Sequence, residues 1–281
     1  MSVSGTAESM LVDVRLAEAP LWQRWYLRNE RLLLGLAGFV SVLIVWDLAV
    51  RLGYLRVTFV SSPSRIFDAA RLEVSQGRIW GDIGVSLLEF GLGYAAAAVL
   101  GISIGFVAGW FRRANYIIDP WLAALYATPD VALVPLIILW LGIGLWSKVF
   151  VVFLTSLFAV AINTLVGVQS TEARFLEVAH SFGASRARVF RTVVLPSTVP
   201  FILTGLRLAS GRALVGVVLA ELIAANQGIG FMISVSGSTL NTARLMVGVI
   251  LLGAFGVLLG EVMRRVERRF DAWRPQMGDG R

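Results

Sequence analysis

Long apolar stretches occupy most of this chain and restrict it to membrane-spanning helices. A helix that crosses a lipid bilayer needs about 20 predominantly apolar residues. Six stretches reach about this length: Arg31–Val50, Ile83–Trp110, Trp121–Leu145, Val149–Val168, Val199–Ala224 and Leu245–Met263. The third and fourth are separated only by the short Gly142–Gly144 region. The sequence therefore predicts an all-α membrane protein with six transmembrane helices.

Composition agrees with this fold class and excludes several kinds of chemistry. Only 15% of the 281 residues are charged, whereas a soluble domain carries roughly 25%. Cysteine is absent, which rules out disulfides and thiol chemistry, and the chain has a single histidine, His180. No clustered carboxylates or nucleophile pair accompany that histidine, so a membrane enzyme is disfavoured. We predict no catalytic residues and no metal site.

The basic residues predict how the chain is oriented in the membrane. With the N-terminus inside, the inner segments carry 16 Lys and Arg residues and the outer segments carry 7, as expected because cytoplasmic loops collect positive charge. These residues cluster at the ends of apolar stretches, so the net charge of +7 predicts contact with lipid and not with nucleic acid. Residues 1–20 lack the pattern of a cleavable signal peptide, so we expect the first span to be retained.

The spans divide the chain into three predicted regions. Residues 1–30 are expected to form a cytoplasmic N-terminal segment with an interfacial helix, residues 31–263 the transmembrane domain, and residues 264–281 a cytoplasmic tail. Within the second span, Gly101, Gly105 and Gly109 recur every four residues, which predicts close packing against another helix. Asp47 and Glu89 lie within spans and are expected to be hydrogen-bonding partners between helices.

One polar segment, residues 169–198, interrupts the membrane pattern on the predicted cytoplasmic side. Phe175, Val178, Ala179 and Phe182 have helical spacing. Gly183 follows where such a helix would end, Ser185 can cap a second short helix, and Leu195–Pro196 is expected to stop that helix before the fifth span. The segment therefore predicts a compact helix, glycine turn and helix exposed to the cytosol.

The same segment resembles the E-A-A-x3-G-x9-I-x-L-P signature of binding-protein-dependent ABC importer permeases. The matching residues here are Glu177, Val178, Ala179, Gly183, Val193, Leu195 and Pro196, with both gaps preserved and valine at two positions of the motif. In that family the segment docks on a separate ATPase subunit. The resemblance implies a coupling segment over residues 170–196, in which the coupling residues are Glu177, Ala179, His180, Gly183, Ala184, Ser185, Leu195 and Pro196.

Further stretches are similar to one branch of this family, the nitrate, taurine and alkanesulfonate permeases, which also includes bicarbonate and thiamine-precursor transporters. They are Ser61–Ser64, Asp119–Pro120, Thr128–Pro129, Pro135, Ile138–Gly144, Ser147–Lys148, Gly205–Arg207, Ala220–Glu221 and Gly228–Gly230. The resemblance implies the methionine/maltose-permease type of importer fold, a homodimer, and a location in the bacterial inner (plasma) membrane. It also implies two cytoplasmic ATPase subunits and a periplasmic or extracellular solute-binding protein.

The sequence contains no G-x-x-x-x-G-K-[ST] phosphate loop. We therefore expect no cofactor on this chain, and ATP and Mg²⁺ on the partner subunit. A secondary transporter or channel that works without ATP would explain six spans equally well, but not the coupling signature.

Three ionisable residues in the fifth span are candidates for the translocation pathway: Arg207, Arg212 and Glu221. Charged residues within spans usually face the interior of the protein or a partner. The two arginines could attract an anion of the sulfonate, taurine or nitrate type. Alternatively, Arg207 lies at the inner interface, or the arginines pair with carboxylates for structural reasons.

Overall fold

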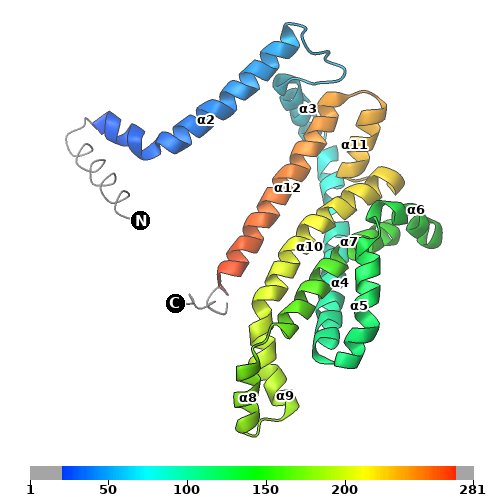
Figure 1. Ribbon diagram of the computed structural model, residues 1–281. Coiled ribbons are helices and arrows are strands. Elements are labelled where there is room, and N and C mark those ends of the chain that lie inside the picture. Colours follow the sequence, from blue (N-terminus) through cyan, green and yellow to red (C-terminus); the bar gives the residue numbers. More distant parts are fainter. Residues whose placement is uncertain (1–20, 270–281) are drawn as a thin grey trace. The chain divides into compact units, whose positions relative to one another are not determined.

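The computed structural model describes residues 21–269, which are almost entirely helical (Figure 1). The side chains of residues 21–28, 31 and 32 lie outside the description, as do the predicted N-terminal segment before residue 21 and the tail after residue 269. The long helices are α2 (Leu21–Arg51), α4 (Arg78–Trp110), α7 (Leu145–Gln169), α10 (Leu195–Ala224) and α12 (Thr242–Arg269). The shorter ones are α3 (Pro63–Ser75), α5 (Arg112–Ala127), α6 (Asp130–Leu141), α8 (Ala173–Ser181), α9 (Arg186–Val189) and α11 (Ile229–Ser238).

Residues 1–65 and 66–281 form two compact units. In the described part of the first unit, α2 holds the first span, and residues 21–30 continue the same helix. Asp47 lies near its end and forms an ion pair with Arg51 (2.6 Å). The Asp47 carboxylate also accepts a hydrogen bond from the Ser64 hydroxyl (2.8 Å), which ties the end of α2 to the residues that begin α3.

The second unit is built around α7, which is buried along most of its length between α4 and α10. Small residues allow this packing, as the glycine repeat predicted. A Cβ atom on Gly105 would lie 2.5 Å from Thr164 Cβ, and one on Gly109 would lie 2.6 Å from Val168 Cβ. Because α4 and α7 approach so closely, a larger side chain at these positions would force the helices apart.

Five of the described helices are long and apolar enough to cross a membrane, and a sixth span exists only if α5 and α6 are taken together. The prediction of one continuous third span over Trp121–Leu145 is corrected here, because α5 and α6 meet at an angle of 100°. Thr128 precedes Pro129 and adopts an extended conformation, with ψ at 130°. The proline ring disfavours helical geometry at the residue before it, so the helix ends there.

The break between the third and fourth spans lies where the sequence predicts it. Gly142 ends α6 with φ at 75°, and its N–H bonds to the Ile138 carbonyl (2.8 Å). This left-handed conformation suits glycine, and it turns the chain into α7 at Leu145. The helices α3 and α11 are additional elements that the span pattern alone does not reveal.

Candidate functional site

The polar segment between α7 and α10 forms two helices joined by a glycine turn, as predicted. Gly183 lies between α8 and α9 with φ at 67°, a conformation that glycine adopts without strain. Its N–H bonds to the His180 carbonyl (2.8 Å), and the Ala184 N–H bonds to the Ala179 carbonyl (3.1 Å). These two carbonyl groups in the last turn of α8 therefore have hydrogen-bond partners. Ser185 Oγ accepts a hydrogen bond from the backbone N–H of Arg188 (3.4 Å) and caps α9.

The region around Leu195 and Pro196 differs from the prediction. Instead of stopping at Pro196, the helix continues from Arg186 to Ala224 without interruption. A π-helical turn, Phe190–Val194, replaces the expected break, and the Leu195 N–H bonds to the Phe190 carbonyl five residues earlier. Pro196 is tolerated because it occupies the first turn of α10, just after this wider turn. The second helix of the segment is therefore a direct extension of α10.

The two halves of the segment have different surroundings. Val189 and Val194 are buried, and the ring of Phe190 packs edge-on against Phe106 and Trp110 of α4, with 5.3 Å between ring centroids in both cases. In contrast, α8 has no buried residue at all. The continuous helix therefore anchors the segment, and α8 is carried outward from one end of the bundle (Figure 1).

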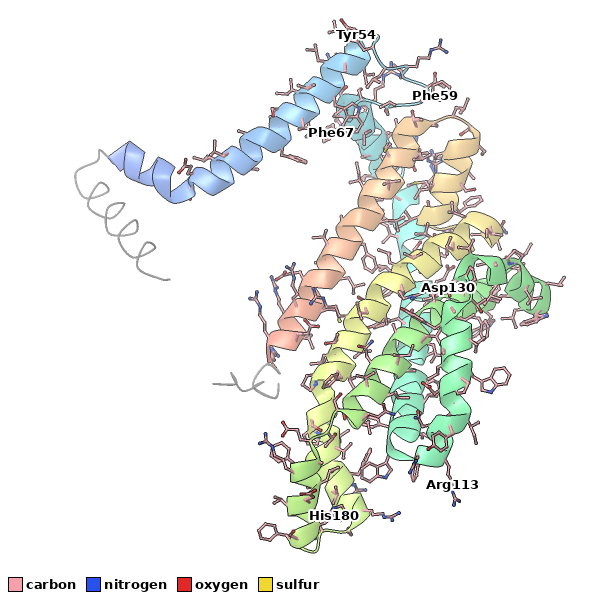
Figure 2. The ribbon with its side chains drawn as sticks, in the orientation of Figure 1. Tyr54, Phe59, Phe67, Arg113, Asp130 and His180 are labelled. Carbon is pink, nitrogen blue, oxygen red and sulfur yellow. The ribbon has the colours of Figure 1, made fainter. Side chains whose placement is uncertain are left out.

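Apolar and polar side chains of α8 are both exposed. Phe175 and Val178 are about half exposed, and Phe182, which directly follows α8, is 86% exposed. Glu177 and His180 are also exposed, with His180 Nδ1 2.6 Å from the Leu176 carbonyl (Figure 2). A cleft of about 750 Å³ opens between this segment and the end of α4, and its lining includes Trp110, His180, Arg186, Phe190 and Arg191. The segment thus offers a mixed apolar and polar surface that no other described helix covers.

A second cluster lies at the opposite end of the bundle and is fully buried. Glu221 of α10 accepts hydrogen bonds from the Ser86 hydroxyl and from the Gly230 N–H, both at 2.6 Å. Glu89 of α4 is 0% exposed and forms an ion pair with Lys148 at the start of α7. The cluster therefore places two carboxylates and one ammonium group among α4, α7, α10 and α11, and it connects all four helices.

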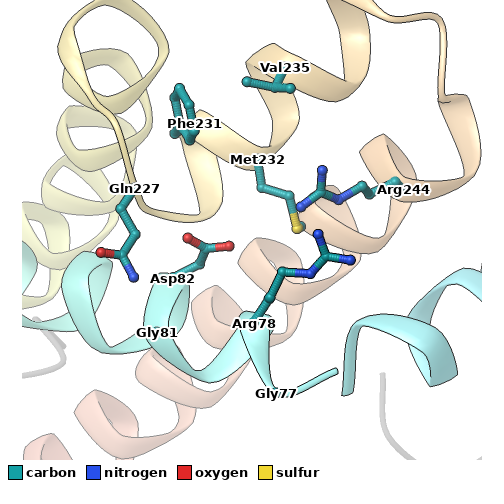
Figure 3. A pocket seen from close by; sticks show the side chains of 9 residues that line it. All are labelled: Gly77, Arg78, Gly81, Asp82, Gln227, Phe231, Met232, Val235 and Arg244. Atoms are coloured by element: carbon teal, nitrogen blue, oxygen red, sulfur yellow. The ribbon is translucent and has the colours of Figure 1, made fainter. Parts of the chain in front are cut away.

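The loop that contains Gly228 and Gly230 wraps around the Glu221 carboxylate. A Cβ atom on Gly228 would overlap that carboxylate, so a larger residue does not fit there. The Gly228 N–H donates to Asp82 Oδ1 (3.0 Å), at the edge of a pocket of about 430 Å³. Figure 3 shows Arg78, Asp82 and Arg244 around this pocket, and Arg244 pairs with Glu73 of α3 (2.9 Å).

The structure separates the three pathway candidates of the fifth span. Glu221 belongs to the buried cluster and is only 1% exposed. Arg207 pairs with Glu267 near the end of α12 (3.1 Å). Arg212 pairs with Asp130, the first residue of α6, at 2.9 Å. All three are engaged with other side chains or with backbone. Arg207 and Arg212 both keep part of their side chains exposed, and Arg212 is the one of the three that pairs with a residue beside the bend between α5 and α6.

Sequence reasoning did not assign roles to Lys148 or Asp130. Each is an ionisable residue that directly follows a break in an apolar stretch, Lys148 after Gly142–Gly144 and Asp130 after Pro129. A charge at such a point needs a partner once the chain is in a membrane, and this signal could have identified both residues. The identity of the partner could not be read from sequence, because Glu89 and Arg212 are distant along the chain.

Comparison with known proteins agrees with this architecture. Residues 98–273 match the family described as "Binding-protein-dependent transport system inner membrane component". The taurine transport system permease protein TauC of Escherichia coli is 32% identical over 94% of this chain and 98% of its own length. The putative aliphatic sulfonates transport permease protein SsuC of Bacillus subtilis is also 32% identical, over 85% of this chain and 87% of its own length.

A solved structure of the MetNI methionine ABC transporter, in an inward-facing conformation, matches with a TM-score of 0.60. It is 15% identical and covers 70% of this chain and 98% of its own. This likeness confirms the predicted importer fold. The chain is a multi-pass membrane protein and belongs to the family of inner-membrane permease components of binding-protein-dependent ABC importers.

Proposed function

We propose that this permease forms half of the pathway of an ATP-driven importer for a small sulfonate-type solute. In the assembled transporter, two copies of the chain pair with each other. Two separate ATPase subunits bind from the cytoplasmic side, and a solute-binding protein delivers the solute from outside. Closure of the ATPase subunits on ATP moves α8 and the helices attached to it, and this motion switches the pathway between its outward-open and inward-open states.

The observation that carries this proposal is the exposure of α8. A short helix with exposed Phe175, Val178 and Phe182 has no reason to stand outside the bundle unless another protein covers it. Only the Gly183 turn separates it from the span, because α9, the π turn and α10 form one continuous helix. In this proposal a force applied to α8 passes through that turn to a membrane span.

The energy source is assigned to the partner because the sequence lacks a phosphate-binding loop. In this proposal the ATPase subunits bind ATP and Mg²⁺, and the permease binds neither. The proposed solute class comes from the relatives, two of which are named as permeases for taurine and for aliphatic sulfonates. A secondary transporter or channel is the alternative, but it would leave the exposed apolar face of α8 without a role.

The glycine turn gives a direct test of coupling. Gly183 has a positive φ and no heavy atom within 4 Å of the position a Cβ would occupy, so a substitution there acts on backbone conformation and not through a clash. A left-handed conformation costs a β-branched residue about 1–2 kcal/mol, whereas asparagine adopts it more readily. We expect Gly183→Val to lower solute uptake per ATP hydrolysed about tenfold, and Gly183→Asn to behave nearly as wild type.

The measurement uses the permease purified together with its ATPase partner and reconstituted in vesicles with the binding protein. Uptake of radiolabelled taurine and release of phosphate are recorded in the same preparation. Wild-type uptake that does not depend on ATP would identify a secondary transporter. Normal uptake by Gly183→Val, with the ATPase still attached, would show that the turn does not transmit coupling.

A further inference from the structure

Arg212 lies at the middle depth of the membrane-spanning bundle. With a rise of about 1.5 Å per residue, it is about 26 Å from the start of α10 at Leu195 and about 18 Å from its end at Ala224. The contacts that α10 makes with α7 on either side of Arg212 give the same depth. Gly205 packs against Asn163, and Gly216 packs against Thr155. Arg212 is therefore level with the stretch between these two residues, which is the centre of α7.

Three elements meet at this arginine. Its Nη2 atom is 2.9 Å from Asp130 Oδ2, and its Cζ lies 5.0 Å from the centroid of the Tyr126 ring. Tyr126 belongs to the last turn of α5 and Asp130 is the first residue of α6, so both lie beside the 100° bend. Figure 2 shows Asp130 where α6 approaches α10.

This group differs from the buried pair of Glu89 and Lys148 because it is partly open. The Arg212 side chain is 36% exposed and that of Asp130 is 18% exposed. A Cβ atom on the neighbouring Gly211 would meet no heavy atom of another element within 4 Å in the described part of the chain. Charged side chains at this depth are not left in contact with lipid, and usually face a water-filled cavity or a partner. A break in a helix at membrane depth is likewise tolerated where it lines such a cavity, and transporters use such breaks to bind solutes.

We propose that Arg212, Asp130 and Tyr126 form the site at which the permease holds its solute in transit, and that the site takes a small organic sulfonate. The guanidinium donates to Asp130 through one of its nitrogen atoms, and the remaining N–H donors are available for the sulfonate oxygens. Asp130 and the Tyr126 ring fix the plane of the guanidinium, so they act as positioning residues. The adjacent carboxylate also offsets the positive charge, which favours release of the anion.

The proposal rests on the proposed function, because it assumes that the open face of α10 borders the pathway. It also has a structural alternative, in which the ion pair only fastens α6 to α10. The experiment separates the two with Arg212→Gln and with the charge swap Arg212→Asp/Asp130→Arg. The swap preserves an ion pair but moves its cation to another helix. The control is Arg265→Gln, which removes an exposed arginine of α12 and its pair with Glu261.

Uptake of radiolabelled taurine and ATP hydrolysis are measured for each variant in the reconstituted complex with its binding protein. We expect Arg212→Gln to reduce uptake at least about tenfold, as the loss of a charge-assisted contact predicts, with ATP hydrolysis within about twofold of wild type. The swap is expected to remain defective, and Arg265→Gln to lose less than about twofold.

Two results would overturn the site: wild-type uptake by Arg212→Gln, or recovery of uptake in the charge swap. A wild-type complex that hydrolyses ATP with its binding protein but imports no sulfonate would refute the solute class and this site with it. That outcome would leave the ATP-driven mechanism in place. A wild-type complex without ATP-dependent uptake would refute the mechanism itself, so the two failures are distinguishable.

Discussion

The cluster around Glu89, Lys148 and Glu221 holds two acidic side chains and a single basic one inside the bundle. Replacing Lys148 with methionine removes the ammonium group and leaves Glu89 buried without a counter-charge, which costs about 3–5 kcal/mol. We therefore expect Lys148→Met to lower the apparent unfolding temperature of the purified protein substantially. Adding Glu89→Gln to the same chain removes the unpaired charge and should recover most of the loss.

The control for this prediction is the exposed ion pair between Arg265 and Glu261 on α12. Such surface pairs contribute about 0–1 kcal/mol, so Arg265→Met should scarcely change the unfolding temperature in the same detergent. If Lys148→Met proved as stable as this control, the ammonium group would not be what stabilises the buried carboxylates.

At the residue scale, the sequence indicates which positions need partners but not what those partners are. Glu89 was expected to bond between helices, and it does so with Lys148. Glu221 is a pathway candidate from its place in the fifth span, and in the structure it is buried under the Gly228–Gly230 loop. A charged residue within an apolar stretch is predicted to be buried or to pair with another side chain. Which of these occurs depends on the packing between helices that are far apart in the sequence.

Among the helices, α5 and α6 are bent relative to each other at Pro129, the residue that precedes α6. Pro129 keeps Thr128 out of the helical conformation, whereas Pro120 lies inside α5 without breaking it. We expect Pro129→Ala to loosen the 100° bend and Pro120→Ala to leave it unchanged. Because the chain has no cysteine, spin labels can be placed on cysteines introduced at the exposed residues Tyr116 and Leu139, one on each helix.

The readout is the distribution of distances between these two labels. Pro129→Ala should broaden or shift it, and it should also reduce uptake, because Asp130 would no longer be held against Arg212. An unchanged distribution in Pro129→Ala would mean that contacts with α7 and α10, and not the proline, set the bend.

At the element scale, the sequence predicts the long apolar helices. It does not predict the bend within the third span or the π turn before Pro196. The stretches that became α4, α7, α10 and α12 were identified within a few residues, because apolar length alone determines that they are spans. The third span is bent at Thr128–Pro129, a dipeptide that indicates a helix boundary, although the apolar run continues through it. The π turn before Pro196 leaves no signal in composition, and the sequence pattern predicts a helix end there instead.

For the whole molecule, the two ends of the bundle must face opposite sides of the membrane. The segment with α8 lies at one end, and the turn between α11 and α12 lies at the other (Figure 1). The excess of basic residues on the α8 side predicts that this end is cytoplasmic, although five arginines between the first and second spans, Arg51, Arg56, Arg65, Arg71 and Arg78, oppose the trend. The overall balance of charge therefore predicts that α8 faces the cytoplasm.

Single cysteines in a chain that has none allow the orientation to be measured directly. Phe182, which directly follows α8, and Leu240 in the α11–α12 turn are both well exposed, at 86% and 57%. With a thiol reagent that cannot cross membranes, we expect Leu240→Cys to be labelled in intact spheroplasts and Phe182→Cys only after permeabilisation. The reverse pattern would place α8 outside the cell, where no ATPase could reach it. An ATPase in the cytoplasm could then not dock on α8, and the proposed coupling would be refuted. The labelling therefore tests the orientation of the whole bundle, on which the proposed mechanism depends.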